Sequence, residues 1–200
     1  MNTKKETAHK KEVALQKQKS YNDVIQWLDS NWHQERTKSN LEAFKKLDQA
    51  LGSPSKKINS ILVTGTNGKG LAINFVNQLF QEENVSVGSF LSPYILSYNE
   101  QISTNNESIA NKSFTDLSNE ILNTASTLNI KIHSIDLLSM LSLMYFKNSQ
   151  SDVAVMEISE NINWHPLEIC SPKITAITRV TIDDNNVPHE SVSNAIDKAL

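Results

Sequence analysis

The chain has 200 residues, 20% of them charged, and a formal net charge of -3. This length accommodates one well-filled α/β domain with a short appendage and is short for two independent domains. The nearly balanced charge excludes a strong electrostatic attraction to nucleic acid or to an anionic membrane. Any anion that the protein binds must therefore be held by a local arrangement of groups.

The N-terminal region begins with a basic arm, residues 1–19, which shows no clear apolar face and which we expect to be flexible. No apolar run of signal or transmembrane length follows it. The single cysteine, Cys170, cannot form an internal disulfide, and no cysteine spacing typical of zinc sites occurs. These features favour a cytoplasmic protein without a membrane partner.

Two amphipathic helices are predicted within residues 20–57. Apolar residues recur at helical spacing in "YNDVIQWLDSNW" and again in "NLEAFKKLDQALG". Gly52 and Pro54 end the second helix. We assign these helices to an N-terminal segment that precedes the main domain, residues 58–200.

A strand, a tight loop and a helix follow in "KINSILV", "TGTNGKG" and "LAINFVNQLFQEENV". The next strand is "VSVGSFL", and "SPYILSYNEQIS" is predicted to be irregular, with a short hairpin at its end. "NKSFTDLSNEILNTASTL" has helical periodicity and opens with Ser113 or Thr115 as a capping residue. "SIDLLSMLSLMYFKN" is a more apolar helix, as expected of one that packs against a sheet.

Two buried strands are predicted in the last third of the chain, "SDVAVMEIS" ending in Glu157 and "KITAITRVTI" ending near Asp183 and Asp184. Strands that alternate with helices favour a parallel sheet covered on both faces, hence a three-layer α/β domain. In such sheets ligands bind at the carboxyl ends of the strands. The residues of the glycine-rich loop, Ser92, Glu157 and the two aspartates all follow strands, which predicts one shared site.

The stretch "TGTNGKG" is a candidate phosphate loop, because it supplies glycines for close backbone approach, a lysine and the start of a helix. It departs from the general GxxxxGK[ST] pattern, since Val63 stands at the first glycine position and Gly70 follows the lysine. An ordinary glycine turn is the alternative. The concentration of glycines after a hydrophobic strand favours nucleotide binding by Thr64, Gly65, Thr66, Asn67, Gly68, Lys69 and Gly70.

Several segments together resemble the folylpolyglutamate synthase and dihydrofolate synthase family of the Mur ligase superfamily. The loop is similar to that family's GTNGKGS, "LSPYILSYNEQI" to its SPHL…ERI segment and "DVAVME" to the strand before EVGLGGRLDATN. "SIDLLSMLSLMYF" resembles its FE…T…F-x-yF helix, "SPKITAITRVTIDD" its P…ITNIGLDH strand, and "SNAIDKAL" its IA-x-EKAGI helix. The likeness runs in order over about residues 21–200.

This resemblance implies a P-loop-type central domain of a Mur ligase and an amide ligase that uses ATP and Mg²⁺. The family phosphorylates a carboxylate on a folate or dihydropteroate, and the amine of glutamate then attacks the acyl phosphate. Lys69 would hold the triphosphate. Oxygen ligands would hold the metal between phosphates.

Matching positions extend the predicted site. Ser92 matches the serine of SPHL and Glu157 the first glutamate of EVGLGG, which serve the metal in the family, while Asp184 falls on the histidine of its DH pair. Lys198 falls on a lysine that is carbamylated in the family, which makes it a second catalytic candidate beside Lys69. Each of these residues also has an ordinary structural explanation as a turn serine, a strand-end acid or an exposed helix lysine.

Differences from the family concentrate at these functional positions. Leu71 replaces the serine of GTNGKGS, Tyr94 the histidine of SPHL and Gln101 the arginine of ERI. Ser159, Asn161 and Ile162 stand where the family has glycines, and Asn163 where it has an arginine. Side chains there should alter or block close backbone approach to a ligand.

The sequence stops at Leu200, and the resemblance leads us to expect an incomplete central domain without the family's C-terminal domain. A sheet that ends early exposes a strand edge, which a second chain could cover. Three functions remain open: a folate–glutamate ligase, a catalytically inactive nucleotide-binding or structural remnant, and a ligase with a changed acceptor.

Overall fold

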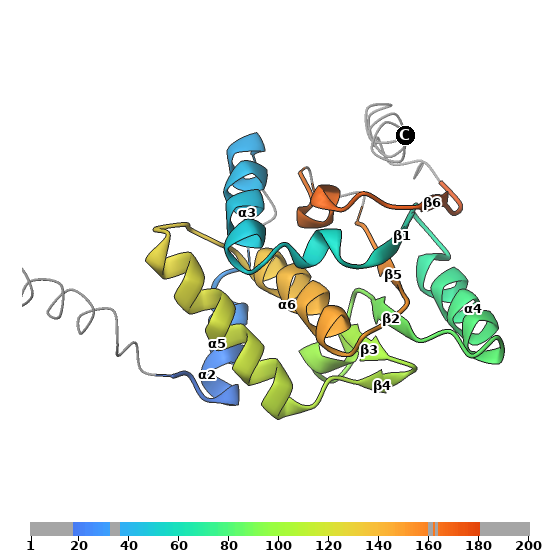
Figure 1. Ribbon diagram of the computed structural model, residues 1–200, viewed down its shortest axis with the longest axis horizontal. Helices are drawn as coiled ribbons and strands as arrows, with labels where there is room; N and C mark the ends of the chain where they lie inside the picture. Colours follow the sequence, from blue (N-terminus) through green and yellow to red (C-terminus); the bar gives the residue numbers. More distant parts are fainter. Residues whose placement is uncertain (1–17, 33–36, 160–161, 163, 181–200) are drawn as a thin grey trace, which may run out of the picture.

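The computed structural model describes residues 18–32, 37–159, 162 and 164–180 (Figure 1). In these residues one six-stranded sheet has the order β4-β3-β2-β5-β1-β6. Its strands are β1 (Asn59–Thr64), β2 (Val87–Phe90), β3 (Ile102–Thr104), β4 (Glu107–Ser108), β5 (Val153–Glu157) and β6 (Ile174–Ile177). Strands β2, β5, β1 and β6 are parallel, whereas β3 and β4 form an antiparallel hairpin on the β2 side. The predicted mainly parallel sheet and the short hairpin are confirmed.

Helices cover both faces of this sheet, which confirms the three-layer α/β fold (Figure 1). One face carries α4 (Lys69–Glu82). The other carries the group α2 (Tyr21–Ser30), α3 (Lys38–Ala50), α5 (Asn111–Thr127) and α6 (Ser134–Asn148). Short 3₁₀ turns lie at η1 (Pro54–Lys56), η2 (Tyr98–Gln101) and η3 (Pro166–Ile169). Among the described residues, no helix is both long and apolar enough to cross a bilayer.

Alternate residues of the central strands face two separate hydrophobic cores, because successive side chains of a strand point to opposite faces. In β1, Leu62 joins the core beneath the four-helix group, whereas Ile61 and Val63 face α4. In β5, Met156 joins the first core and Val155 the second. This alternation within uninterrupted apolar strands indicates burial on both faces.

The larger core lies between the sheet and α6, a helix that is buried almost all round. Phe146 of α6 packs directly over β2, where a Cβ added at Gly88 would lie 2.5 Å from its ring. Only glycine at position 88 therefore leaves room for this phenylalanine. Cys170 borders the same core, and its burial raises the pKa of the thiol to about 12.

The N-terminal helices α2 and α3 belong to this larger core. Val24 and Leu28 of α2, together with Phe44 and Leu47 of α3, are buried in the cluster that contains Leu137 of α6. Ser134 at the start of α6 also donates from its hydroxyl to the Leu28 carbonyl at 2.6 Å. The described helices within residues 20–57 thus share a core with the sheet domain.

The start of α5 differs from the prediction. The helix begins at Asn111 after Ala110, so neither Ser113 nor Thr115 is its capping residue. Thr115 lies a full turn inside and donates its hydroxyl to the Asn111 carbonyl at 2.7 Å. Such a bond to the preceding turn satisfies a hydroxyl within a helix, which is why the residue type alone misplaced the boundary.

Strand β6 also differs from the prediction of a buried strand. It forms four register pairs with β1, but Ile174 and Ile177 are exposed. Its apolar sequence suggested burial, whereas its position at the edge of the described sheet leaves its side chains accessible. Asp183 and Asp184, predicted to follow this strand, lie outside the described residues.

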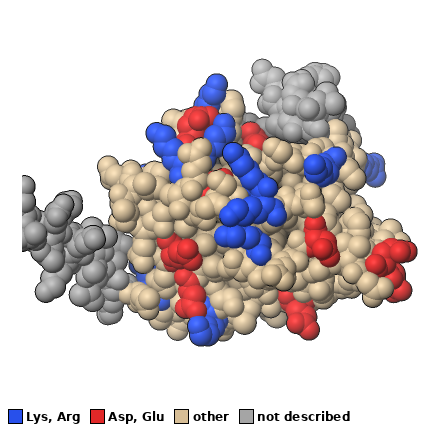
Figure 2. Space-filling model, in the orientation of Figure 1, with Lys and Arg blue, Asp and Glu red and all other residues tan. Residues whose placement is uncertain are grey.

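Charge is mixed over the face shown in Figure 2, where acidic side chains surround a small group of Lys and Arg side chains near the centre. No extended field of one sign develops on this face. The pattern agrees with the small net charge of -3.

Candidate nucleotide site at the ends of the central strands

Three parallel strands bring the predicted site residues to one edge of the sheet. Strand β1 ends at Thr64 and leads into the glycine loop, β5 ends at Glu157, and β2 is followed by Ser92. Val63 of β1 and Glu157 are register partners, so the loop begins directly beside the glutamate. The prediction that residues far apart in sequence converge here is confirmed for the described positions.

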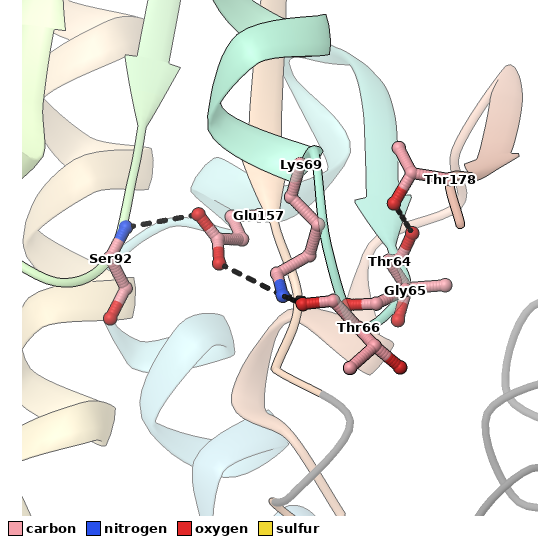
Figure 3. A network of polar contacts seen from close by, with 7 residues as sticks. All are labelled: Thr64, Gly65, Thr66, Lys69, Ser92, Glu157 and Thr178. Atoms are coloured by element: carbon pink, nitrogen blue, oxygen red, sulfur yellow. Dashed lines mark hydrogen bonds and ion pairs between the residues drawn. The ribbon is translucent and has the colours of Figure 1, made fainter. Parts of the chain in front are cut away.

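Lys69, the first residue of α4, lies over the glycine loop (Figure 3). Its Nζ donates to the Gly65 carbonyl at 2.6 Å and to the Thr66 carbonyl at 3.4 Å. The same Nζ lies 3.6 Å from Oε1 of Glu157. Only 14% of the lysine side chain is accessible. The ammonium therefore joins the loop to the end of β5.

Glu157 links the lysine to the segment that follows β2 (Figure 3). Its side chain is 8% accessible, and its Oε2 accepts a hydrogen bond from the Ser92 backbone N–H at 3.2 Å. A buried carboxylate is costly unless a cation or donors compensate it. Lys69 and the Ser92 N–H supply that compensation. The Glu157 carboxylate therefore connects the start of α4 to the segment that follows β2.

The glycines of the loop have distinct roles. Gly65 has φ 128° and Gly68 has φ 87°, values that residues with a Cβ rarely adopt. A Cβ at Gly65 would lie 2.3 Å from Oγ1 of Thr178, whereas one at Gly68 or Gly70 would meet no atom within 4 Å. Gly65 therefore permits close packing against Thr178, just after β6, and the other two glycines leave open space beside the start of α4.

Two backbone N–H groups of the loop are already engaged. Those of Thr66 and Asn67 both donate to the Arg179 carbonyl, at 2.9 and 3.1 Å. These two N–H groups are therefore paired within the protein, with the residue that follows Thr178. The first-turn N–H groups of Gly70 and Leu71 have no intrahelical acceptor, and they lie at the positive end of the helix dipole.

Leu71 exposes 64% of its surface in the first turn of α4. The resemblance places a serine hydroxyl at this position. An exposed leucine contributes neither a ligand for a cation nor a core contact. The first turn of α4 therefore lacks the polar side chain that the resemblance predicts at this position.

The other divergent positions are accommodated within the fold. Tyr94 contacts Tyr98 in a tilted arrangement with ring centroids 4.4 Å apart, Gln101 is buried, and Ile162 packs against the larger core. Ser159 lies just after β5. Asn161 and Asn163 lie outside the described residues. Ile162 thus gains an apolar contact that the glycine expected from the resemblance could not make.

The segment after Ser92 contains polar residues that the sequence analysis missed. The Glu100 carboxylate accepts from the backbone N–H groups of Ile95, Leu96 and Ser97 at 3.0 to 3.2 Å, and these bonds lower its pKa. Tyr98 donates to Asp29 at 2.8 Å, and burial raises the pKa of its phenol. The spacing of Ser97 and Glu100, typical of a capping box, was the available signal.

The described residues supply only part of the predicted metal site. Glu157 and Ser92 are brought together, whereas Asp184 and Lys198 lie outside the described residues. Within the described ranges, no three or more His, Cys, Asp or Glu residues are close enough to hold a metal ion. One carboxylate and one serine are oxygen donors suited to a hard cation, but they form an incomplete set.

Comparison with known proteins adds to this geometry. The chain is 29% identical over 173 residues to a dihydrofolate synthase/folylpolyglutamate synthase of Bacillus subtilis, and 28% identical over 139 residues to a folylpolyglutamate synthase of Lacticaseibacillus casei. These matches cover 84% and 67% of this chain. Over these residues the chain is similar in sequence to folylpolyglutamate and dihydrofolate synthases. No family model matches it.

The fold agrees with this relationship. A crystal structure of a bifunctional folylpolyglutamate synthase/dihydrofolate synthase with Mn, AMPPNP and L-glutamate bound superposes with a TM-score of 0.78 at 20% identity, over 90% of this chain and 43% of that one. The present chain spans 40% of the Bacillus relative's length and 32% of the Lacticaseibacillus relative's. What it shares with these synthases is therefore the part that carries the glycine loop and the central strands.

Proposed function

We propose that the chain binds ATP through the loop of residues 64–70 as part of a folylpolyglutamate synthase-like ligase. The observation that carries this proposal is the convergence of Lys69, Glu157 and the Ser92 segment beside the glycine loop (Figure 3). A helix N-terminus with a lysine and open space at Gly68 and Gly70 suits a phosphate chain. The nucleotide analogue and L-glutamate named for the structural neighbour support the same assignment.

The proposed reaction joins glutamate to a carboxylate of a folate or dihydropteroate. A carboxylate oxygen attacks the γ-phosphorus with loss of ADP, and the glutamate amine then displaces phosphate to form the amide. Lys69 would neutralise charge on the phosphates, and the N-terminal turn of α4 would orient them. Most of the rate enhancement would come from positioning and charge stabilisation.

A divalent cation, Mg²⁺ in this proposal, would supply charge neutralisation between the phosphates. Glu157 and Ser92 provide hard oxygen donors beside the loop, and Asp184 is the further ligand predicted from the sequence. Glu157 already contacts Lys69 and the Ser92 N–H, so its carboxylate is oriented toward the loop. Lys198, the second proposed catalytic residue, is assigned by resemblance alone.

Titration of Mg·ATP into the purified chain tests the nucleotide site. We expect saturable binding in the wild type and a loss of about tenfold to hundredfold in affinity in Lys69→Met, since hydrogen bonds to charged groups contribute about 1.5–3 kcal/mol. Lys112→Met is the matched control, because Lys112 is an exposed lysine paired with Asp116 on α5. No binding at millimolar nucleotide would overturn the proposal.

The second candidate function is a catalytically inactive nucleotide-binding remnant. The exposed Leu71 favours it, because that position lacks the hydroxyl expected from the resemblance. ADP release that depends on both a folate or pteroate and glutamate would establish the ligase. Saturable ATP binding without such release, at every acceptor tried, would establish the remnant.

The same assay tests the third function, a ligase with a changed acceptor. Release of ADP with a carboxylate other than a folate or pteroate would identify it. The predicted second chain receives no support from the described residues or the comparisons. A cytoplasmic location remains a prediction.

A further inference from the structure

We propose that Thr178, just after β6, is a positioning residue that holds the glycine loop in its ligand-binding shape. This role goes beyond the proposed function, which assigns ATP contacts to the loop itself. The part of the proposal that concerns ATP affinity rests on the proposed nucleotide site. The part that concerns the shape of the loop does not.

Four hydrogen bonds tie the end of β6 to the loop. The Thr178 backbone N–H and its hydroxyl both donate to the Thr64 carbonyl, at 2.9 and 3.1 Å. The Arg179 carbonyl accepts from the N–H groups of Thr66 and Asn67, at 2.9 and 3.1 Å. Thr178 and Arg179 thus form hydrogen bonds with the loop on both sides of Gly65. We call this set of contacts the β6 clamp.

Shape complementarity reinforces the β6 clamp. The space that a Cβ of residue 65 would occupy is filled by Oγ1 of Thr178, at 2.3 Å from the ideal Cβ position. The Thr178 N and C atoms lie at 3.2 and 3.3 Å from the same point. Gly65 and Thr178 therefore form a matched pair, in which the missing side chain of one admits the hydroxyl of the other (Figure 3).

The β6 clamp decides which part of the loop can meet an anion. It uses the N–H groups of Thr66 and Asn67, so the phosphate donors must come from the residues that follow. It also fixes the Gly65 and Thr66 carbonyls, to which Lys69 donates. Loss of these contacts would let the two carbonyl groups that accept from Lys69, and the first turn of α4, move relative to Glu157.

The variant Thr178→Val tests the clamp, because it removes the hydroxyl donor and keeps the branched shape. We expect the Thr66 and Asn67 amides to exchange with solvent about threefold to tenfold faster and ATP affinity to fall by a similar factor, as for loss of one neutral hydrogen bond. Thr178→Ser retains the donor and should restore both values toward wild type. The amide of Val155 in β5 should not change in either variant.

Thr175→Val is the matched control, since Thr175 is an exposed threonine within β6, three residues before Thr178, and is paired with Leu62 away from the loop. Equal exchange at Thr66 and Asn67 in wild type and Thr178→Val would overturn the proposal, as would an equal effect of Thr175→Val. Amide exchange is measured without nucleotide. If the wild type binds no ATP, the proposed function fails while the exchange comparison still decides the role of Thr178.

Discussion

The two faces of the sheet differ in how completely they are covered. Beneath α2, α3, α5 and α6 lies a continuous core that includes Phe44, Phe114 and Phe146. On the other face, α4 buries Ile73 against Ile61, Val63, Val87, Val153 and Val155. Along the same helix, Leu71, Phe75 and Leu79 are exposed. The glycine loop thus lies at the start of the less deeply buried helix, whereas the larger core lies on the opposite face of the sheet.

This difference suggests that the larger core contributes most of the stability, while the smaller core positions α4. Strands β1 and β5 contribute side chains to both cores, and the larger core contains most of the buried residues. We therefore expect the larger core to fix the positions of these strands, and with them the positions of Glu157 and the loop. The helix that begins with Lys69 depends mainly on Ile73 and its neighbours. We therefore expect substitutions beneath the four-helix group to unfold the protein, and substitutions under α4 to affect the site at a smaller cost in stability.

The largest expected effect is that of Phe146→Ala. Removing this ring from the core over Gly88 should lower the free energy of unfolding by about 3–5 kcal/mol, as for other buried aromatic truncations. Urea denaturation followed by circular dichroism measures it. Phe75→Ala, an aromatic truncation at an exposed position, is the control and should change stability little.

Ile73→Ala should have the next largest effect, about 2–4 kcal/mol, because its fully buried side chain anchors α4 to the sheet. It should also weaken ATP binding, since the first turn of α4 would lose its anchor. The same denaturation assay and the ATP titration measure the two effects. A greater loss of stability than in Phe146→Ala would contradict the proposed division between the two faces.

Acid should loosen the segment after Ser92 before it unfolds either core. Backbone N–H groups of Ile95 and Leu96 lower the pKa of Glu100, so its stabilising contribution is complete above the ordinary glutamate pKa and is lost as pH falls through the lowered value. An NMR titration should show the Ile95 and Leu96 amides shifting together in that range.

Glu100→Gln should reproduce much of this loosening at neutral pH, because an amide accepts more weakly than a carboxylate. Glu107→Gln, at an exposed position in β4, is the matched control. If the Ile95 and Leu96 amide shifts change only at the pH at which the near-ultraviolet circular dichroism of the whole protein is lost, the segment does not loosen separately from global unfolding.

The smallest expected effect is that of Leu71→Ser. Leu71 is exposed, so the free energy of unfolding should change by no more than about 0.5 kcal/mol. The added hydroxyl should increase the dependence of ATP affinity on Mg²⁺, measured by titration with and without the metal. An unchanged dependence would show that the missing hydroxyl is not what separates this site from the one expected by resemblance.

Much of this fold could be predicted from local pattern. Helical spacing located α2, α3, α4 and α6, and apolar runs located β1, β2 and β5, because these elements bury regular faces. Their order also placed Lys69, Ser92 and Glu157 at one edge of the sheet. The start of α5 was misplaced because the Thr115 hydroxyl finds an acceptor inside the helix.

The sequence by itself determined the kind of site, since glycines, a lysine and strand-end oxygens carry their chemistry wherever they lie. Only the tertiary structure decided which partners these groups contact. It placed Glu157 between Lys69 and Ser92, engaged the Thr66 and Asn67 N–H groups with Arg179, and left β6 exposed at the edge of the described part of the sheet. These facts depend on contacts between residues more than 60 positions apart in the chain, as for Ser92 and Glu157 (65 apart), and no local pattern records which acceptor a donor will meet.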